Sequence, residues 1–594
     1  MMVPGSESSS SVPNLDLVER VARRYAVENA LKFGKARPGP VINKVLGELK
    51  ELKPYAREIA KIVTRIVEEI NSMSPDDIKR LAEELGVTEK KPSVSEEKHL
   101  PPLPNVEVWG YVKTRFAPNP DFVIHLGNAR AAILSHEYAR MYNGKFVLRF
   151  EDTDPRIKVP MPEAYEMIRE DLRWLGLSWD EEYVQSLRME IYYEIAKKLI
   201  EVGGAYVDLC PPQEFRKYRD AGKPCPHRDE PVEVQLERFE KMLRGDYGEG
   251  EAVLRIKTDL SYPDPSVRDW VAFRIIDTEK HPHPIVGDKY RVWPTYNFAA
   301  AVDDHLMGVT HILRGREHAV NTVKQMFLYK HLGWRYPEVI NFGRVFLVGF
   351  ILSKSKIKEL LRKGGTKFMG VDDIRFGTIA ALRRRGILPE TIRQLILELG
   401  TKPTDASVAW ENIAALNRKI ADRKCRRVFV VLNPVKVVIE GLETPVTVSI
   451  RYHPSTDLGK RSYTLTKPEV YISRKDYEEF REKGVRLMEF ANIEFVEERG
   501  DHVVAKFLST NVDDARKRGL QIVQWVPVEH AVRVSIYRAE GLKLIKVPRD
   551  GVALGEKALL TEIGVGEVVQ MVRIGFGRID SKTKSRVTVM YAHD

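Results

Sequence analysis

A histidine-containing tetrapeptide at residues 125–128 is the first group whose residue types and position suggest chemistry. An apolar run, residues 106–116, precedes it, and a helical pattern, residues 129–142, follows it before a second apolar run at residues 145–150. This order predicts a strand, a proline-rich turn, a helix and a parallel strand. Ligands of parallel sheets bind beyond the carboxyl ends of the strands, and a helix N-terminus favours phosphate. The sequence therefore predicts a phosphate site at the tetrapeptide.

Three residues of this turn have predicted roles. Gly127 would let a ligand approach the backbone closely, because glycine has no Cβ. His125 and Asn128 would add side-chain donors. His125 could instead be a buried structural histidine, and its position alone does not decide between the two.

A second motif, Ser353-Lys354-Ser355, lies far downstream, after the glycine-punctuated apolar stretch of residues 343–350. A mobile, basic, hydroxyl-rich loop suits a developing pyrophosphate, because lysine supplies a point charge and serine supplies hydrogen bonds. Taken alone the motif is weak, since most such runs are solvated surface.

Two arginines suggest the charge of a small substrate. Residues 293–317 combine a helix that carries an aromatic and two acids with a strand that ends in Arg314. Arg115 ends the first strand of the sheet and would point into the same crevice, where arginine forks match carboxylates. The pair favours an anionic substrate, although each arginine could instead pair with a neighbouring acid such as Asp303 or Glu317.

Four residues have the spacing of a metal site. Asp208 and Cys210 are followed, after fourteen residues, by Cys225 and His227. Two close pairs of this kind fit a tetrahedral structural zinc, with aspartate the weakest of the four ligands. The alternative is two free buried cysteines. The zinc would cross-link and stabilise an inserted subdomain over residues 206–283 and take no part in catalysis.

Composition bounds the class of protein. A chain of 594 residues is too long for one core, and roughly three to five domains are expected. The net charge of +11 suits a polyanionic partner. Three cysteines make no disulfide framework. No apolar run approaches the roughly 20 residues that span a bilayer, and residues 1–14 read as a flexible tail without a signal peptide, so we expect a soluble, cytoplasmic protein without membrane partners.

The regions around the central sheet differ in pattern. Residues 15–86 are helical, with Ser74 a candidate cap, and suit a docking or scaffold role; residues 90–104 read as a linker. Residues 371–400 and 408–420 are helical and contain three consecutive arginines, residues 383–385, which could touch RNA phosphates or form a solvated face. After Arg426, short β-branched runs alternate with turns, which predicts two small barrels.

The two motifs together resemble the signatures of class I aminoacyl-tRNA synthetases. The first departs from His-Ile-Gly-His by Leu126 and Asn128, and the second keeps the Ser-Lys-Ser core of Lys-Met-Ser-Lys-Ser. Residues 115–128, 149–154 and 293–317 resemble, more specifically, the glutamyl-tRNA synthetases of the archaeal type. The likeness is strong over residues 106–364 and looser elsewhere, and the nearest family of the same subclass is that of the glutaminyl-tRNA synthetases.

The resemblance implies a fold of α/β and all-β parts. It consists of an N-terminal helical domain, a Rossmann-type catalytic domain with an inserted acceptor-binding subdomain, a helical connecting subdomain, and two β-barrel anticodon-binding domains. The corresponding ranges are 1–105, 106–370 with the insertion at 206–283, 371–425, and 426–594.

The resemblance also implies the reaction: ATP-dependent activation of L-glutamate, with Mg²⁺, and transfer to the terminal adenosine of tRNA-Glu. Members of this subclass usually require bound tRNA before activation. His125 and Lys354 would be catalytic. The glutamate-binding residues would be Arg115, Glu151, Tyr296 and Arg314, and the ATP-binding residues Pro118, Gly127, Asn128, Ser353 and Ser355.

Arg314 is the discriminating position in this resemblance. The glutamate enzymes carry arginine there and the glutamine enzymes an uncharged residue, and a buried guanidinium that faces an amide would be left unpaired. Ala300 stands where some bacterial relatives carry asparagine, so that contact is lost.

Three alternatives stay open. The first is a glutaminyl-tRNA synthetase, which Arg314 disfavours. The second is an inactive RNA-binding relative, which would be expected to lose His125 or Lys354, although both are present. The third is a nucleotidyltransferase that uses no RNA. Whether tRNA-Gln is also charged stays undecided by the sequence, and a monomer is the family-based expectation.

Overall fold

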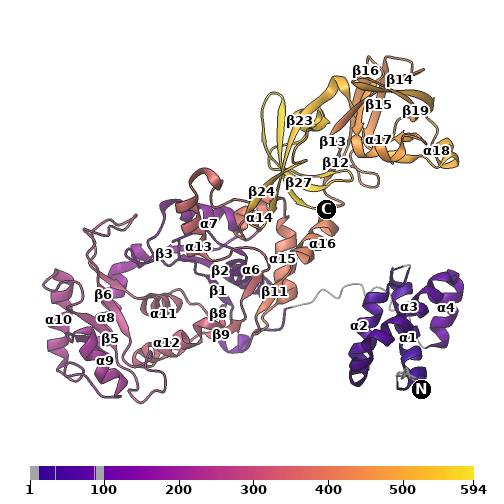
Figure 1. Ribbon diagram of the computed structural model, residues 1–594. Helices are drawn as coiled ribbons and strands as arrows, with labels where there is room; N and C mark the ends of the chain where they lie inside the picture. Colours follow the sequence, from indigo (N-terminus) through magenta and orange to yellow (C-terminus); the bar gives the residue numbers. More distant parts are fainter. Residues whose placement is uncertain (1–12, 34, 86, 88–99) are drawn as a thin grey trace, which may run out of the picture. The chain divides into compact units, whose positions relative to one another are not determined.

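The computed structural model describes residues 13–33, 35–85, 87 and 100–594, which form two compact units, residues 1–99 and 100–594 (Figure 1). Most of the expected N-terminal tail and the first ten residues of the expected linker lie outside the described residues. In the part of the chain that is described, no helix is both long and apolar enough to cross a bilayer.

The N-terminal unit is helical, as the stripes of apolar residues predict. On its most amphipathic helix, buried residues recur every three or four positions, from Ile59 to Ile70. Ser74 caps the last helix, because its hydroxyl accepts a hydrogen bond from the Asp77 N–H at 3.2 Å. The elements are α1 (Leu15–Phe33), α2 (Pro38–Glu48), η1 (Lys50–Tyr55), α3 (Ala56–Ser72) and α4 (Pro75–Glu84).

A parallel sheet forms the centre of the second unit. Its strands β1 (Lys113–Phe116), β2 (Lys145–Phe150) and β3 (Glu181–Val184) are parallel and joined by α6 (Leu126–Met141) and α7 (Pro162–Trp174). A second parallel pair, β8 (His311–Gly315) and β9 (Glu338–Phe342), begins beside β1, where the Thr310 N–H donates to the Lys113 carbonyl at 2.9 Å. The predicted strand–helix–strand unit is confirmed.

The first apolar run is only partly a strand, which corrects the expectation for residues 106–116. Its first residues form the short helix α5 (Val106–Trp109). Gly110, with φ of +74°, ends that helix and turns the chain, and strand pairing with β2 begins at Lys113. Apolar residues without period-two alternation do not separate a buried strand from a helical turn.

An antiparallel sheet is inserted between β3 and β8. Before it come η2 (Gln185–Arg188) and α8 (Met189–Glu201), and α9 and α10 lie beside its strands (Figure 1). Its last strand ends at Pro294, so the sheet continues past residue 283. The elements are β4 (Ala205–Asp208), α9 (Pro212–Asp220), α10 (Val232–Arg244), β5 (Val253–Ile256), β6 (Val271–Ile275) and β7 (Val292–Pro294).

Helices surround the rest of the central sheet. After β7 come α11 (Tyr296–Leu306), η3 (Arg316–His318) and α12 (Ala319–Leu332). Residues 371–378, predicted helical, form turns instead; the following helix starts only after Thr378, whose hydroxyl accepts from the Ala381 N–H at 3.1 Å. The remaining elements are β10 (Val345–Leu347), α13 (Lys354–Gly364), η4 (Gly365–Lys367), α14 (Ile379–Arg385), α15 (Pro389–Leu399), β11 (Ala406–Val408) and α16 (Trp410–Ala421).

The three arginines on α14 do not form a free basic patch. Arg385 is buried and lies over the Trp410 ring, with its guanidinium carbon 4.0 Å from the ring centroid. Arg384 forms ion pairs with Asp580 at 2.7 Å and Asp372 at 3.0 Å. The side chains of Arg384 and Arg385 therefore form contacts within the protein and are not available to bind RNA.

The C-terminal region is β-rich, as predicted, and its sheets are barrel-like. The two larger sheets have eight and seven strands and take strands from distant parts of the sequence, and residues 446–451 and 460–465 pair as a separate two-stranded sheet. A buried ion pair between Arg461 and Glu556, at 2.7 Å, joins two strands of the region that do not pair with each other. Three short helices, which the pattern of β-branched runs did not predict, interrupt the strands.

The elements of this region are β12 (Arg426–Val428), β13 (Val430–Leu432), β14 (Pro434–Glu440), β15 (Val446–Arg451), β16 (Lys460–Leu465), β17 (Glu469–Ser473), α17 (Arg474–Phe480), β18 (Val485–Leu487), β19 (Asn492–Arg499), β20 (His502–Ser509), α18 (Val512–Arg518), β21 (Gln521–Val523), β22 (Val526–Pro527), η5 (Val528–His530), β23 (Ala531–Glu540), β24 (Lys543–Val547), β25 (Ala553–Glu556), α19 (Ala558–Thr561), β26 (Val568–Met571), β27 (Gly575–Lys582) and β28 (Arg586–His593).

Candidate active site and metal cluster

A cavity of about 1010 Å³ opens where β1, β2 and β8 end. This is the edge at which parallel sheets bind ligands. The cavity brings together ten of the eleven residues proposed for catalysis, ATP and glutamate; only Ser355 does not line it. Those ten residues are Arg115, Pro118, His125, Gly127, Asn128, Glu151, Tyr296, Arg314, Ser353 and Lys354.

His125 is both the cap of α6 and a wall of the cavity. Its Nδ1 accepts a hydrogen bond from the Gly127 N–H at 3.0 Å, and the backbone N–H of His125 donates to Asn128 Oδ1 at 3.2 Å. In a neutral imidazole the proton then sits on Nε2. Burial, assisted by the charge of Lys354, lowers the pKa of His125 to about 4. The neutral ring keeps its Nε2–H free of the capping contact, and its role as a donor to a ligand stays a prediction.

Gly127 lies directly beside the ring of His125. A Cβ at this position would lie 2.9 Å from Cε1 of His125 and 3.1 Å from its Nδ1. The absent side chain makes room for the capping imidazole, and the close approach of a ligand at Gly127 stays a prediction.

The second motif begins a helix, which corrects the expectation of a mobile loop. Ser353 caps α13 by accepting from the Lys356 N–H at 3.4 Å, and its hydroxyl lies 3.1 Å from that of Ser355. Lys354 reaches Asp121, in the turn of the first motif, with Nζ 3.0 Å from Oδ1. A charge–charge contact thus joins the two motifs.

One short strip of backbone, residues 376–379, also links the two motifs. The Gly377 N–H donates to the Ile351 carbonyl at 3.1 Å, and the Gly377 carbonyl accepts from the Leu126 N–H at 3.2 Å. A Cβ on Gly377 would lie 2.2 Å from Leu352 Cδ2, so any larger residue would require the Leu352 side chain to move. The strip fixes the spacing between the motifs across the cavity.

Buried ion pairs organise the other end of the cavity. Arg115 Nε lies 3.1 Å from Asp304 Oδ1, while Arg149 lies 2.8 Å from Asp304 and 2.9 Å from Glu151. Burial alone would raise the pKa of Asp304, but the two guanidiniums hold it below its usual value. Arg115 thus pairs with an acid, as the alternative interpretation allowed, although the acid is Asp304 and not Asp303.

Arg314 differs from the other two arginines. It is 5% exposed, and its guanidinium contacts only uncharged groups: Tyr296 at 3.4 Å, Gln325 at 3.2 Å, Thr322 at 2.6 Å and Tyr336 at 3.3 Å. Among the residues that the structure describes, no carboxylate forms an ion pair with it. The alternative interpretation, in which each arginine pairs with a neighbouring acid such as Asp303 or Glu317, therefore does not hold for Arg314.

The charges at this end leave one positive charge uncompensated. Three guanidiniums, of Arg115, Arg149 and Arg314, face two carboxylates, of Asp304 and Glu151, so the sum is +1 and the surplus sits on Arg314. The arrangement suits a small zwitterion that carries one additional negative charge. Glu151, although held by Arg149 at 2.9 Å, also lines the cavity, where its carboxylate suits an ammonium group.

Sequence reasoning missed several residues of the site. Arg149 and Asp304 complete the buried ion pairs, and His318 lines the cavity with its ring 5.5 Å from that of Tyr296. Burial lowers the pKa of His318 to about 4. An arginine inside an apolar strand, at position 149, was the one signal in the sequence, because a charge there needs a buried partner.

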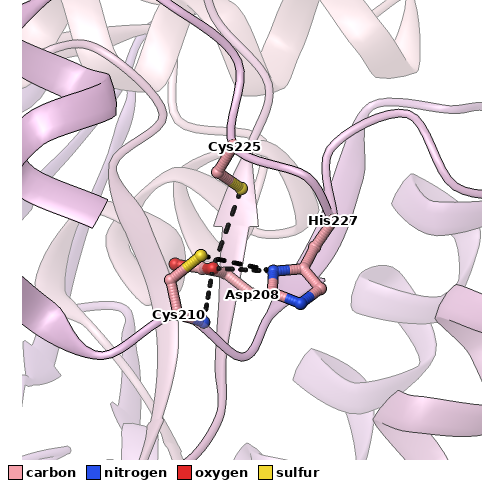
Figure 2. A group of neighbouring side chains, drawn as sticks. All are labelled: Asp208, Cys210, Cys225 and His227. Atoms are coloured by element: carbon pink, nitrogen blue, oxygen red, sulfur yellow. Dashed lines mark hydrogen bonds and ion pairs between the residues drawn. The ribbon is translucent and has the colours of Figure 1, made fainter. Parts of the chain in front are cut away.

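The four predicted metal ligands also converge, at the end of β4 and in the loop before α10 (Figure 2). His227 Nδ1 lies 3.3 Å from Asp208 Oδ1 and 3.4 Å from Cys210 Sγ, and Cys225 Sγ lies 3.7 Å from the same Asp208 oxygen. Ligands on a tetrahedral zinc, bonded at about 2.0–2.3 Å, stand roughly 3.3–3.8 Å apart. The group therefore has the size and donor set of a zinc site.

A second contact orients Asp208. Its other oxygen, Oδ2, accepts from Arg255 Nε at 2.7 Å, which leaves Oδ1 toward the cysteines and the histidine. Burial raises the pKa of the Cys210 thiol, and the neighbouring Asp208 raises it further.

The fold and cavity are those of a class I synthetase, and comparison with known proteins agrees. Residues 111–422 match the model of the tRNA synthetases class I (E and Q), catalytic domain, and residues 425–512 match the anti-codon binding domain of the same group. The catalytic match covers more than half of the chain. The chain belongs to the class I tRNA synthetases for glutamate and glutamine.

Of the two kinds of enzyme in this family, the similar proteins are glutamate–tRNA ligases. A glutamate–tRNA ligase of Hyperthermus butylicus is 55% identical and covers 94% of this chain and 99% of its own length. Those of Thermofilum pendens and Ignicoccus hospitalis are 52% and 50% identical, each over 97% of this chain and 99% and 100% of their own lengths. The likeness includes the N-terminal helical unit.

Proposed function

We propose that this chain is a glutamate–tRNA ligase: with ATP it activates L-glutamate and transfers it to the 3′-terminal adenosine of tRNA-Glu. The observation that carries this is Arg314, a buried guanidinium without a carboxylate partner among the described residues, at the wall of the cavity. L-glutamate carries a net charge of −1 and matches the surplus of +1, whereas glutamine is neutral.

Activation is an in-line displacement at the α-phosphorus of ATP. An oxygen of the glutamate α-carboxylate forms the new P–O bond, the bond to the β-phosphate oxygen breaks, and pyrophosphate leaves. The Nε2–H of His125 donates to a phosphate oxygen, and Lys354 neutralises charge on the leaving pyrophosphate. Mg²⁺, arriving with ATP, would further neutralise charge on the phosphates.

Transfer completes the reaction. The ribose 2′-hydroxyl of the terminal adenosine attacks the activated carbonyl, an ester bond forms, and AMP leaves with the electrons of the broken acyl–phosphate bond; the hydroxyl proton passes to a phosphate oxygen. The β-rich region would read the anticodon by stacking and by hydrogen bonds to base edges. Whether that reading admits tRNA-Gln beside tRNA-Glu is a matter for the assay.

A charging assay tests the proposal. Purified chain, ATP and Mg²⁺ are incubated with labelled glutamate or glutamine and with tRNA-Glu or tRNA-Gln. Glutamate on tRNA-Glu supports a discriminating ligase, and glutamate on both tRNAs supports one with wider scope. Glutamine on tRNA-Gln would overturn the role of Arg314. Absence of any charging would favour an inactive RNA-binding relative.

We also propose that Asp208, Cys210, Cys225 and His227 hold a structural Zn²⁺. The convergence of the four donor atoms within 4.8 Å of one another supports this, as does the orienting contact from Arg255. The ion would join the two segments of the insertion that carry the ligands. Metal analysis of protein purified without chelators should give one zinc per chain, and substoichiometric metal would contradict the site.

A further inference from the structure

The groups that surround Arg314 form a layer behind the cavity. Thr322 and Gln325 lie three residues apart on α12, and Tyr336 lies in the loop before β9. These three side chains contact the guanidinium but do not line the cavity. They hold Arg314 from the side opposite to a bound ligand.

Gln325 is the central acceptor of this layer. It is fully buried, and its Oε1 accepts from Arg314 Nη1 at 3.2 Å and from the Tyr336 hydroxyl at 2.6 Å. Burial raises the pKa of Tyr336 to about 12, so that its hydroxyl keeps the proton it donates. One neutral oxygen therefore fixes both the direction of the guanidinium and the tyrosine beside it.

Residue 325 carries a neutral amide, and this lack of charge is the property that affects Arg314. Glutamate would be isosteric with glutamine here and would make a stronger hydrogen bond to arginine, since it adds an ion pair. The chain instead places an amide there, and the amide Nε2 is buried without a hydrogen-bond partner within the described ranges, which is a cost. A carboxylate would bury its second oxygen in the same place, but it would also neutralise Arg314, whereas the amide leaves the guanidinium charged.

We propose that Gln325 is a specificity-determining positioning residue, which orients Arg314 while leaving its charge unneutralised for the side-chain carboxylate of the substrate. A carboxylate at this position would bring the buried charge of the site from +1 to zero. A neutral site no longer favours glutamate over glutamine. The inference rests on the proposed function, because it assigns the structural origin of the preference for glutamate at that same site.

The test compares two substitutions that differ in charge. In Gln325→Glu the shape is kept and the neutralising charge is added; in Gln325→Met the acceptor is removed without charge. Calorimetry measures the affinities for glutamate and glutamine, and charging assays give kcat/KM for both. Tyr336→Phe, which removes one partner of Gln325 but no charge, is a third variant that does not depend on either replacement being tolerated.

The proposal expects Gln325→Glu to lower the glutamate-to-glutamine preference by about 100-fold, through weaker glutamate binding. Gln325→Met and Tyr336→Phe should weaken glutamate binding by about tenfold or less and keep most of the preference. If Gln325 had only a structural role, all three variants would bind glutamate and glutamine more weakly by the same factor. That result would overturn the proposal. So would an unchanged preference in Gln325→Glu.

Binding and charging separate this proposal from the proposed function. Selective glutamate binding by the unmodified chain that Gln325→Glu abolishes would support the role of Gln325 even if no tRNA were charged, and only the ligase activity would then be wrong. An unmodified chain that binds glutamine as tightly as glutamate would overturn the role of Gln325, whatever its charging activity.

Discussion

The backbone N–H of Gly127 donates to Nδ1 of His125 at 3.0 Å, so the first helical turn after the turn motif holds the histidine that precedes it. This one contact caps the start of α6, places the proton of the neutral ring on Nε2 and fixes the direction in which Nε2 points. The absent side chain of Gly127 is part of the same arrangement, because a Cβ there would strike the ring.

Gly127→Ala should therefore act on His125. The added methyl would stand 2.9 Å from Cε1, and the ring must move away, which removes the donor from the phosphates. We expect adenylate formation to fall by about 100-fold or more, with little change in the KM for glutamate. Tests are ATP–pyrophosphate exchange in the presence of tRNA and the free energy of unfolding. Gly564→Ala is a matched control, since its nearest neighbour would be 3.8 Å away, and loss of activity there as well would contradict the explanation.

The protonation of His125 gives a pH prediction. Its pKa in the folded chain, about 4, lies below the ordinary value near 6.5. The unfolded chain therefore takes up this proton more readily, so the contribution to stability is complete above about pH 6.5 and declines as the pH falls toward 4. Histidine NMR titration, assigned with His125→Asn, should show no transition for this ring between pH 6 and 8. A midpoint near 6.5 would contradict the buried neutral donor.

The pair formed by Lys354 and Asp121 predicts opposite effects of two substitutions. Lys354→Ala removes the charge that meets pyrophosphate, and we expect kcat for activation to fall by about 100-fold or more. Asp121→Asn weakens the contact at 3.0 Å that the lysine must leave to meet that group. Because the pair is partly exposed, we expect an increase of only a few-fold at most. A loss as large as that of Lys354→Ala would instead make Asp121 essential for placing the lysine.

The metal cluster predicts a difference between buried cysteines. Cys225→Ser should lose the bound zinc and lower the thermal midpoint of the insertion, because one strong ligand is replaced by a weak one. Cys425, also buried but distant in the fold from these ligands, supplies the control. Cys425→Ser should keep one zinc per chain in mass spectrometry under native conditions. Equal metal content in both variants would contradict the site.

Arg385 predicts a stability effect where the sequence suggested an RNA contact. Its guanidinium is buried over Trp410, and burial lowers its pKa to about 10. Arg385→Ala should cost about 2–4 kcal/mol in the free energy of unfolding, since packed surface is lost. Arg423→Ala, at an exposed site, should change stability by less than about 0.5 kcal/mol. Chemical denaturation compares the two, and similar values would contradict the structural role.

Much of the site was predictable because the sequence determines it locally. The tetrapeptide at 125–128 follows a strand and begins a helix, and those signals need only neighbouring residues. The spacing of Asp208, Cys210, Cys225 and His227 likewise suffices to predict a cluster, since ligand pairs at a fixed separation recur in zinc sites.

The remainder depends on contacts between distant residues. Nothing near Arg314 in the sequence indicates that Gln325 and Tyr336 surround it, or that Glu317 does not pair with it. The same holds for Asp304, which pairs with Arg115 and is adjacent to an acid named only as an example in the alternative interpretation. In the β-rich region, β-branched runs identify strands, but their order within the sheets follows from packing that no local pattern contains.

The strip at residues 376–379 has a consequence for how ligands affect this chain. Since Gly377 is hydrogen-bonded to the segments of both motifs, a nucleotide that draws the motifs closer must also displace the strip and α14, which starts within it. Thermodynamic linkage makes this dependence reciprocal. If nucleotide binding favours one position of α14, then a contact that holds α14 in that position must tighten nucleotide binding by an equal factor. A helix outside the cavity would then help to determine the affinity of the cavity for nucleotide.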